Sequence, residues 1–242
     1  MNKSLAPNHF DKYQKCGAYH WQQLDCAWSN RQFNSPLAAR YSSIIKLLPK
    51  SVEKLLDVGC GDGYLLYQVN RGHPDAILYG VDTEIDAIHL AEEQLKKKSI
   101  KASLAQLSSE QLPFASDLFD AVVMTDVIEH LEAPQNTLTE IFRVLKKQGL
   151  LLLSTPNKQP DMIWDKHHVQ EFTALELDTM LAAHFQAVQI TACWPMQWFR
   201  QYQKSDLRRK AINHLTRLGY NPFCKTAKPS LKFGQLIAKC VK

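Results

Sequence analysis

The 242-residue sequence has no long hydrophobic run. Its longest purely aliphatic stretch is Leu150–Leu153, whereas a membrane-spanning helix needs roughly 20 apolar residues. The first 16 residues also lack the apolar segment of a secretory signal. From these two absences we expect a soluble, cytoplasmic protein.

Paired cysteines are missing as well. The chain has six cysteines, and none of them forms a Cys-x-x-Cys pair. A disulfide framework is not expected in a cytoplasmic chain of this length. We therefore predict reduced thiols at all six positions, which are Cys16, Cys26, Cys60, Cys193, Cys224 and Cys240.

Acidic residues are scarce near the C-terminus. Residues 194–242 contain eleven Lys and Arg residues but a single acid, Asp206, which gives a net charge of +10. Residues 1–193 have 18 basic and 23 acidic residues, a net charge of −5, so the two parts together give the +5 of the whole chain. The excess positive charge therefore lies in the last fifth of the sequence.

The glycine-rich stretch LLDVGCGDGYLL, residues 55–66, lacks two common nucleotide-binding motifs. A G-x-G-x-x-G fingerprint would need a glycine in place of Tyr64, and no Gly-Lys-Ser/Thr follows as in a phosphate-binding loop. Alternating glycines lose much backbone entropy on folding, which indicates that a ligand approaches the main chain closely. Because Asp62 would repel a pyrophosphate, a phosphate-free cofactor with a positive centre fits better than a nicotinamide dinucleotide.

Short hydrophobic runs alternate with helical patterns along the chain. We expect strands at 54–59, 76–82, 101–107, 119–126, 150–157, 187–194 and 233–241, and helices at 84–98, 134–147 and 174–183. This alternation implies an α/β fold with parallel strands and right-handed crossovers. Such sheets bind ligands at the carboxyl ends of their strands, and Asp57, Asp82 and Asp126 fall near three of these ends.

Five segments, in order and in spacing, resemble the class I S-adenosylmethionine-dependent methyltransferases. Residues 55–66 resemble motif I of that family, and Asp82, 25 residues after Asp57, closes the second strand where the family has its ribose-binding acid. The other three segments are SSEQLPF, FDAVVMTDVIEHL and VLKKQGLLLLSTPN. The likeness covers roughly residues 40–190, and its motifs are most similar to the ubiquinone-pathway O-methyltransferase branch.

The resemblance implies a Rossmann-like fold. We expect a seven-stranded, mostly parallel sheet whose last strand is antiparallel. Residues 1–40 would form a helical N-terminal lid, and residues 41–193 would form the cofactor-binding core. Residues 194–242 would supply a basic helical insertion and the final strand of the core.

The resemblance also implies S-adenosylmethionine as the cofactor. Asp57 would face its ammonium group, and Asp82 would accept hydrogen bonds from both ribose hydroxyls. Ser108 stands where the family often has an aspartate beside the adenine, so this contact would come from its hydroxyl or from the backbone of Leu107 or Ser109. The remaining cofactor-binding residues that we expect are Gly59, Cys60, Gly61, Gly63, Thr83 and Asp126.

The catalytic candidates follow the fourth and fifth strands and are Glu129, His130 and His168. Histidine titrates near neutrality, which suits a general base that acts on a hydroxyl acceptor. A Glu-His pair is widespread at this place in the family, so His130 could instead only hydrogen-bond its own loop.

The same three residues, with Asp126, could hold a divalent metal through oxygen and imidazole ligands. Such a set resembles the metal sites of ubiquinone-pathway O-methyltransferases and of small-RNA 3′-end methyltransferases. The RNA enzymes have a glutamate where this chain has Asp126, which weakens the second likeness. We do not predict a bound metal.

We expect methyl transfer to an oxygen of a small molecule, with nitrogen as the next option. The acceptor would carry a ring or a sugar, or would be lipid-linked. Two alternatives remain open: a metal-assisted 2′-O-methyltransferase of RNA 3′ ends, and a cofactor-binding accessory subunit without turnover of its own.

The N-terminal 40 residues are rich in aromatic side chains. They could close over the cofactor as a lid or pack against the edge of the sheet. These side chains are Phe10, Tyr13, Tyr19, His20, Trp21, Trp28 and Phe33.

Residues 194–218 predict a basic amphipathic helix. Its apolar stripe consists of Leu207, Ala211, Leu215 and Leu218, and it follows the aromatic residues Trp194, Trp198 and Phe199. Such a helix can lie on an anionic membrane or meet a lipid-linked substrate, or it can dock on its own domain with a solvated basic face. Nucleic acid is a less expected partner, because no RNA-binding module is visible.

Overall fold

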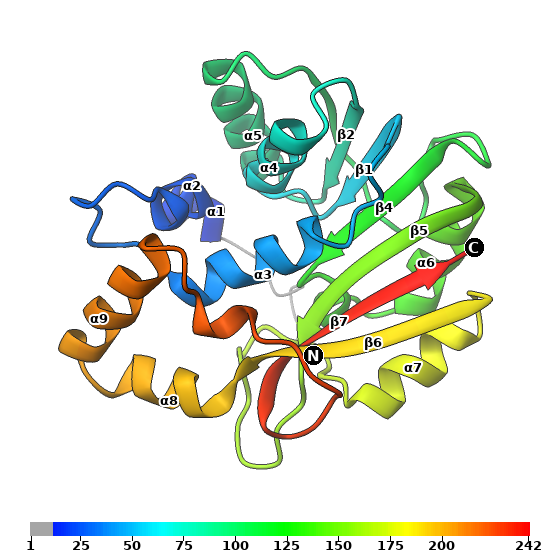
Figure 1. Cartoon of the computed structure of the whole chain (residues 1–242). Helices are drawn as coiled ribbons and strands as arrows, with labels where there is room; N and C mark the ends of the chain where they lie inside the picture. Colours follow the sequence, from blue (N-terminus) through cyan, green and yellow to red (C-terminus); the bar gives the residue numbers. More distant parts are fainter. Residues whose placement is uncertain (1–11) are drawn as a thin grey trace, which may run out of the picture.

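The computed structural model describes residues 12–242, which form one seven-stranded sheet in the order β3-β2-β1-β4-β5-β7-β6 (Figure 1). Strands β1 to β5 are parallel, whereas β7 runs antiparallel to both of its neighbours, β5 and β6. The predicted α/β fold with an antiparallel last strand is therefore confirmed. The strands are β1 (Lys54–Val58), β2 (Ile77–Asp82), β3 (Ala102–Gln106), β4 (Phe119–Thr125), β5 (Leu145–Pro156), β6 (Ala187–Pro195) and β7 (Phe233–Val241).

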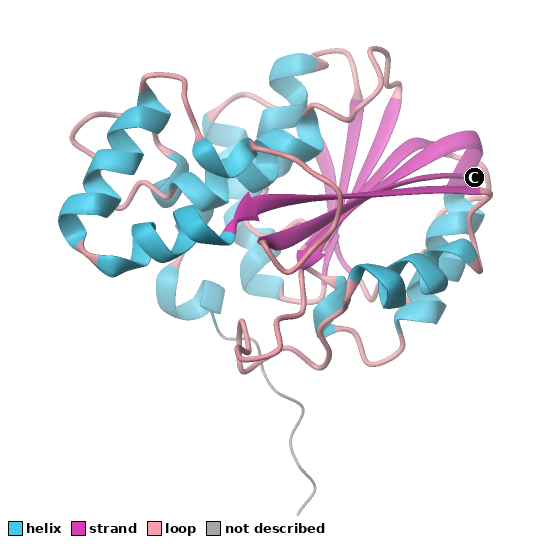
Figure 2. Ribbon diagram, turned by 60° about the horizontal axis from the view of Figure 1, so that its bottom comes forward, coloured by secondary structure: helices cyan, strands magenta, loops and turns pink. Residues whose placement is uncertain are grey.

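Helices cover both faces of the sheet (Figure 2). Consecutive strand residues point to opposite faces, so Leu55 packs into one core and Leu56 into the other. Each fully buried leucine contributes about 1.5–3 kcal/mol of burial free energy. On the Leu55 side lie α3 (Ser35–Ile45), α4 (Tyr64–Gly72) and α5 (Ile85–Lys97), and on the Leu56 side lie α6 (Pro134–Val144) and α7 (Ala174–Ala182).

The boundary between α6 and β5 differs from the prediction. We expected the helix to continue to Lys147, but α6 ends at Val144 and β5 begins at Leu145. Leu145 is fully buried and pairs with Phe119 of β4, so its place in the sheet outweighs the helical spacing of the sequence. The register between the two strands shifts directly after this pair.

The described N-terminal segment packs against a helical insertion that precedes the last strand. The N-terminal helices are α1 (Lys12–Cys16) and α2 (Tyr19–Leu24). The helices α8 (Met196–Lys204) and α9 (Asp206–Arg217) are inserted between β6 and β7 together with η2 (Pro222–Cys224), and α9 lies close to α2 (Figure 1). Asn213 of α9 accepts a hydrogen bond from the Ser35 hydroxyl at 2.6 Å. It also donates one to the Phe33 carbonyl at 2.6 Å, so α9 is attached to the segment that follows α2.

The aromatic residues before α9 pack toward the core of the domain. Trp194 is buried, and Trp198 and Phe199 pack against the core on the Leu55 side. Of the alternatives left open for residues 194–218, the packing of these three side chains favours docking on the domain for this part of the segment. Among residues 12–242, no helix is long and apolar enough to span a bilayer.

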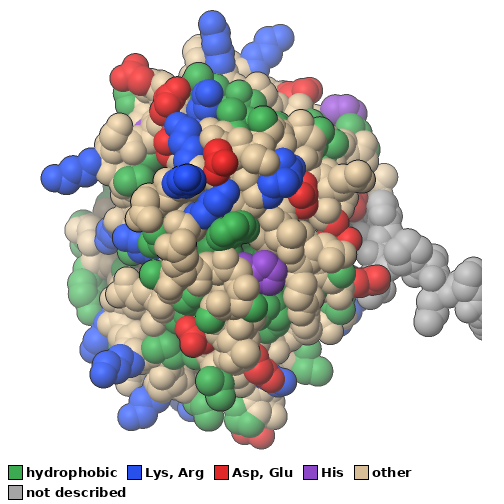
Figure 3. Space-filling view, turned by 90° about the vertical axis from the view of Figure 1, so that its right-hand side faces the viewer, with side chains coloured by type: hydrophobic (Ala, Val, Ile, Leu, Met, Phe, Trp, Pro, Cys, Tyr) green, Lys and Arg blue, Asp and Glu red, His purple; other side chains and the backbone are tan. Residues whose placement is uncertain are grey.

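The face that carries the C-terminus shows charged side chains of both signs mixed with apolar and neutral ones (Figure 3). Lys242, the last residue, forms an ion pair with Asp117 at 2.8 Å, and Lys146 forms another with Asp120 at 2.8 Å. Such exposed pairs contribute little to stability, about 0–1 kcal/mol each. All six cysteines are free thiols, as predicted.

Candidate active site

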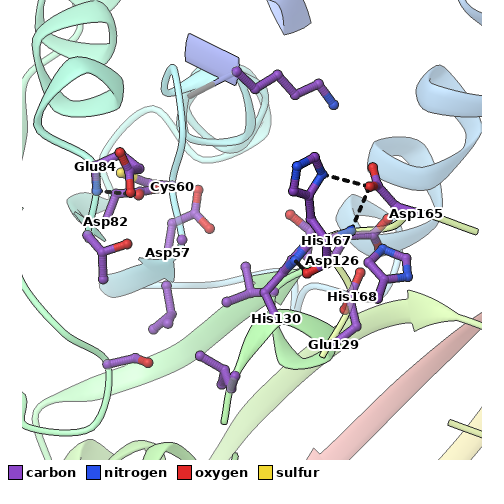
Figure 4. Close-up of a pocket in the computed structure, with 18 of the residues that line it drawn as sticks. Asp57, Cys60, Asp82, Glu84, Asp126, Glu129, His130, Asp165, His167 and His168 are labelled. Carbon is purple, nitrogen blue, oxygen red and sulfur yellow. Dashed lines mark hydrogen bonds and ion pairs between the residues drawn. The ribbon is translucent and has the colours of Figure 1, made fainter. Parts of the chain in front are cut away.

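A cavity of about 600 Å³ lies at the carboxyl ends of the parallel strands. Its lining includes most of the residues that the sequence singled out: Asp57, Gly59, Cys60, Asp82, Thr83, Leu107, Ser108, Asp126, Glu129, His130 and His168. Gly61 and Gly63 shape the adjacent loop without lining the cavity. Figure 4 shows two groups facing this space, with Asp57 and Asp82 on one side and the histidines on the other.

The glycine loop adopts a backbone that glycine alone favours. Gly59 and Gly61 have φ angles of +71° and +54°, in the left-handed region. A Cβ atom on Gly61 would lie 2.1 Å from the hydroxyl oxygen of Tyr13, and one on Gly59 would lie 2.3 Å from a methyl group of Val127. The alternating glycines thus let an N-terminal tyrosine and the loop after β4 approach the end of β1.

Replacing Gly61 with alanine should therefore displace Tyr13 and strain the loop. We expect about 1–3 kcal/mol loss of folding free energy and weaker binding of S-adenosylhomocysteine. Gly72→Ala is the matched control, since Gly72 has no neighbouring atom within 4 Å of the added Cβ. Thermal unfolding and calorimetry of both variants test this, and equal behaviour of the two would contradict the packing described here.

Asp57 is the most isolated charged group of the site. Its side chain is buried, and neither carboxylate oxygen has a hydrogen-bond partner among residues 12–242. Burial, and next the charge of Asp82, raise the pKa of Asp57 well above its usual value. A buried acid without a partner is costly, so this position is suited to a cationic ligand group.

Asp82 ends β2 and orders the loops around it. Its carboxylate accepts hydrogen bonds from the backbone N–H groups of Gly61 at 2.9 Å and Glu84 at 3.0 Å. Burial raises the pKa of Asp82, while these two backbone donors counteract that rise. Each carboxylate oxygen can accept more than one bond, so a diol could still bind Asp82 from the cavity side.

Asp62 has a role that the sequence did not reveal. Its buried carboxylate accepts a hydrogen bond from the His20 backbone N–H at 2.9 Å and lies 3.0 Å from the His20 ring nitrogen Nδ1. The Trp21 indole donates to the Asp62 carbonyl at 2.8 Å. Asp62 therefore attaches α2 to the glycine loop, and Tyr19 and His20 of α2 line the cavity.

His130 lies on the short helix η1 (Ile128–His130), directly after β4. Its Nδ1 is 3.2 Å from the carbonyl oxygen of His167, which can only accept a hydrogen bond. With the proton on Nδ1 for this contact, the neutral ring would have Nε2 as its basic nitrogen. Burial lowers the pKa of His130, so the neutral form dominates at pH 7.

Glu129 and His168 adjoin His130. Glu129 is fully buried, and one of its oxygens accepts a hydrogen bond from Thr155 at 2.9 Å. Burial, and next the charge of Asp126, raise the pKa of Glu129 well above its usual value. The ring of His168 lies 5.0 Å from that of His130, and its Nδ1 is 2.8 Å from a carboxylate oxygen of Glu171.

These three side chains could also hold a metal ion. One ligand atom from each of Glu129, His130 and His168 lies within 4.8 Å of the others. The second oxygen of Glu129 has no hydrogen-bond partner among residues 12–242, and the carboxylate on His168 is a common outer partner of a metal-binding histidine. The donor set therefore fits a divalent cation.

Asp126, which the sequence suggested as a fourth metal ligand, is engaged elsewhere. One oxygen accepts hydrogen bonds from Ser154 at 2.7 Å and Gln235 at 2.6 Å, and the other forms an ion pair with Arg40 at 2.5 Å. Arg40 comes from α3 and lies over the ring of Trp194, 5.2 Å from its centroid. Sequence reasoning missed Arg40, whose only signal was a charged residue on the apolar face of α3.

Family comparison identifies the chain. Residues 49–214, well over half of the sequence, match the family described as a methyltransferase domain. The chain belongs to the S-adenosylmethionine-dependent methyltransferases. This match does not assign the acceptor of the methyl group.

Among curated proteins, the methyltransferase is 26% identical over 214 residues to the uncharacterized methyltransferase YcgJ of Bacillus subtilis, covering 80% of this chain and 83% of that one. It is 27% identical over 153 residues to a ubiquinone biosynthesis O-methyltransferase of Methylococcus capsulatus, covering 62% and 63%. A ubiquinone biosynthesis O-methyltransferase of Cereibacter sphaeroides is 32% identical over 113 residues, covering 47% and 45%. The methyltransferase thus spans less than two thirds of these two O-methyltransferases.

Solved structures share its fold. The crystal structure of Bacillus subtilis YcgJ superposes with a TM-score of 0.60 at 21% identity, covering 85% of this chain and 98% of that one. A Thermotoga maritima methyltransferase, described as a possible histamine N-methyltransferase, gives a TM-score of 0.64 at 15% identity, covering 95% and 97%. At such identities the likeness supports the fold alone.

Proposed function

We propose that this methyltransferase methylates a hydroxyl group of a small molecule and that His130 is the general base. The observation that carries the proposal is the state of His130. Burial lowers the pKa of its ring, its Nδ1 lies 3.2 Å from the His167 carbonyl oxygen, and it lines the cavity on the side opposite Asp57 and Asp82 (Figure 4). A neutral imidazole in this position can accept a hydroxyl proton.

The other side of the cavity is suited to hold the cofactor. In this proposal the unpartnered carboxylate of Asp57 faces the ammonium group, and Asp82 accepts hydrogen bonds from the ribose hydroxyls. Ser108 and the backbone of Leu107 border the part of the cavity left for the adenine. The methyl group on sulfur would then face the histidines.

The chemistry is an in-line displacement. When bound, S-adenosylmethionine would supply a methyl group to the acceptor oxygen, and the electrons of the broken carbon–sulfur bond would remain on a neutral sulfur. The hydroxyl proton passes to Nε2 of His130. Positioning the two reactants supplies about 7–11 kcal/mol of the barrier reduction, and a well-placed base adds about 10²–10⁴-fold in rate.

A hydroxyl on an aromatic ring is the acceptor that we favour. Tyr19, Trp164 and Trp194 line the cavity and offer flat apolar surface to a ring. Two of the curated relatives are ubiquinone biosynthesis O-methyltransferases, which supports oxygen as the acceptor atom. We would follow S-adenosylhomocysteine release with catechols, phenols, sugars and primary amines. Turnover restricted to the amines would contradict O-methylation.

Asp57 yields a paired prediction on stability and binding. Its pKa is raised in the folded state, so the cost to folding free energy is absent below the unfolded value near 4, grows as pH rises from that value toward the raised folded pKa, and is constant above it. Asp57→Asn should therefore stabilise the ligand-free protein at pH 7 by about 1 kcal/mol or more while weakening S-adenosylhomocysteine binding. Thermal unfolding at pH 4 and pH 7, with calorimetry, tests both effects. A variant that binds normally would refute the proposed ammonium contact.

Metal-assisted O-methyl transfer is the second candidate, and the cluster of Glu129, His130 and His168 favours it. In that case a bound cation would polarise the acceptor hydroxyl, and these three side chains would hold it. We expect instead that activity survives dialysis against EDTA, because His130 acts as the base. Activity that is lost on dialysis and restored by Mg²⁺ or Mn²⁺ would replace our proposal with the metal-assisted one.

A further inference from the structure

Helix α9 exposes a row of leucines to solvent. Leu207 is 79% exposed, Leu218 is 66% exposed and Leu215 is 39% exposed, and all three lie with Ala211 on one side of the helix. The helix docks on the domain through its opposite side, where Ile212 and Asn213 are buried. The apolar stripe read from the sequence is therefore not the side that packs on the domain.

Basic side chains flank this row. On a helix with 3.6 residues per turn, Arg208 and Lys210 fall on either side of the leucines, and both are exposed. Trp28, from the loop after α2, extends the apolar surface: it is 60% exposed, and its ring lies 4.8 Å from that of His214 on α9. We define the α9 face as Trp28, Leu207, Arg208, Lys210, Ala211, His214, Leu215 and Leu218.

We propose that the α9 face binds an anionic lipid surface, with the helix lying parallel to the bilayer. A helix of this type buries its apolar side about 5–10 Å into the boundary between headgroups and acyl chains. Each Lys or Arg near an anionic leaflet adds attraction, and the ten net positive charges of residues 194–242 place α9 in the most basic part of the chain. An indole ring at the level of the headgroups is a common anchor.

The arrangement favours lipid over nucleic acid. A nucleic-acid surface would use cations that reach phosphates, but the centre of the α9 face is a row of leucines, which nucleic acid would leave exposed to water. The α9 face also includes part of the loop after α2. Arg217 of α9 donates a hydrogen bond to the Asn30 carbonyl at 2.6 Å, and Trp28 lies in the same loop. Lipid binding would thus hold the segment leading from α2 to α3 against the bilayer.

Flotation with vesicles tests the proposal without requiring turnover. The full chain is mixed with vesicles of phosphatidylcholine alone or with 30% phosphatidylglycerol, a composition of about one anionic lipid in three. We expect flotation with the anionic vesicles only, and its loss at high salt. The double variant Leu207→Gln/Leu218→Gln should reduce the partition coefficient by about tenfold or more, because two inserted side chains are removed.

The control variant is Leu175→Gln. Leu175 is 75% exposed on α7, which covers the Leu56 side of the sheet and is not part of the α9 face. Its replacement should therefore leave flotation unchanged. Circular dichroism establishes that both variants fold. Absence of the wild-type protein from the floated fraction, equal loss in both variants, or binding to a single-stranded RNA in place of vesicles would each overturn the proposal. Methyl-transfer activity is independent of all these outcomes, so failure here leaves the proposed reaction in place.

Discussion

Replacing Asp82 with alanine should weaken binding of S-adenosylhomocysteine by about 10²- to 10⁴-fold, because two charge-assisted hydrogen bonds of about 1.5–3 kcal/mol each would be lost. The effect should be the largest of any single side chain on the cofactor side of the cavity. Asp82 also accepts hydrogen bonds from Gly61 and Glu84, so part of the loss would come from a disordered loop. Isothermal titration calorimetry measures the affinity directly.

Two further variants separate these contributions. Asp82→Asn keeps the size of the side chain and one acceptor oxygen, so it should retain the fold while losing much of the affinity. Asp75→Ala removes an exposed acid just before β2 and should bind like the wild type. Wild-type affinity in Asp82→Ala would exclude the proposed ribose contact.

Replacing His130 with alanine should lower kcat by about 10²- to 10⁴-fold with the best acceptor, because the hydroxyl proton would lose its base. Binding of S-adenosylhomocysteine should change little, since His130 lies on the other side of the cavity from Asp57 and Asp82 (Figure 4). Steady-state kinetics combined with calorimetry gives both quantities. This split between rate and affinity is what distinguishes a base from a residue that only supports the loop.

The companion variants are His130→Gln and His168→Ala. Glutamine retains a donor for the His167 carbonyl but has no basic nitrogen, so it should be as slow as alanine. His168→Ala should be milder, unless the metal-assisted reaction applies. If His130→Gln restores the rate, the side chain only orders its loop. If the wild-type protein binds the cofactor but turns over no acceptor, an accessory subunit without turnover of its own would replace the proposed enzyme.

Local patterns predicted the fold class. The alternation of short apolar runs with helical spacing predicted an α/β fold with parallel strands, and the acids at strand ends placed Asp57 and Asp82 at the same edge of the sheet. The antiparallel last strand was implied by the family resemblance, and the order of the strands came from the structure. The exception, the end of α6, is a place where local spacing and tertiary packing disagree. Burial of Leu145 beside Phe119 decided it, and no local pattern reports that contact.

The missed residues depend on contacts between distant parts of the chain. Asp62 binds His20, 42 positions away, and Arg40 binds Asp126, so neither role can be read from a short segment. The side of α9 that faces solvent could not be predicted for the same reason. Its stripe of leucines was visible in the sequence, but only the packing of Asn213 on Ser35 shows that the stripe faces outward.

The central claim is that the cofactor binds with its ribose on Asp82 and its sulfur toward His130. A crystal structure of the protein with bound S-adenosylhomocysteine tests this most directly. We predict the ribose hydroxyls on the Asp82 carboxylate, the ammonium group on Asp57 and the sulfur facing the His130 ring across the cavity. A sulfur directed away from His130, or a ribose that does not contact Asp82, would contradict the account.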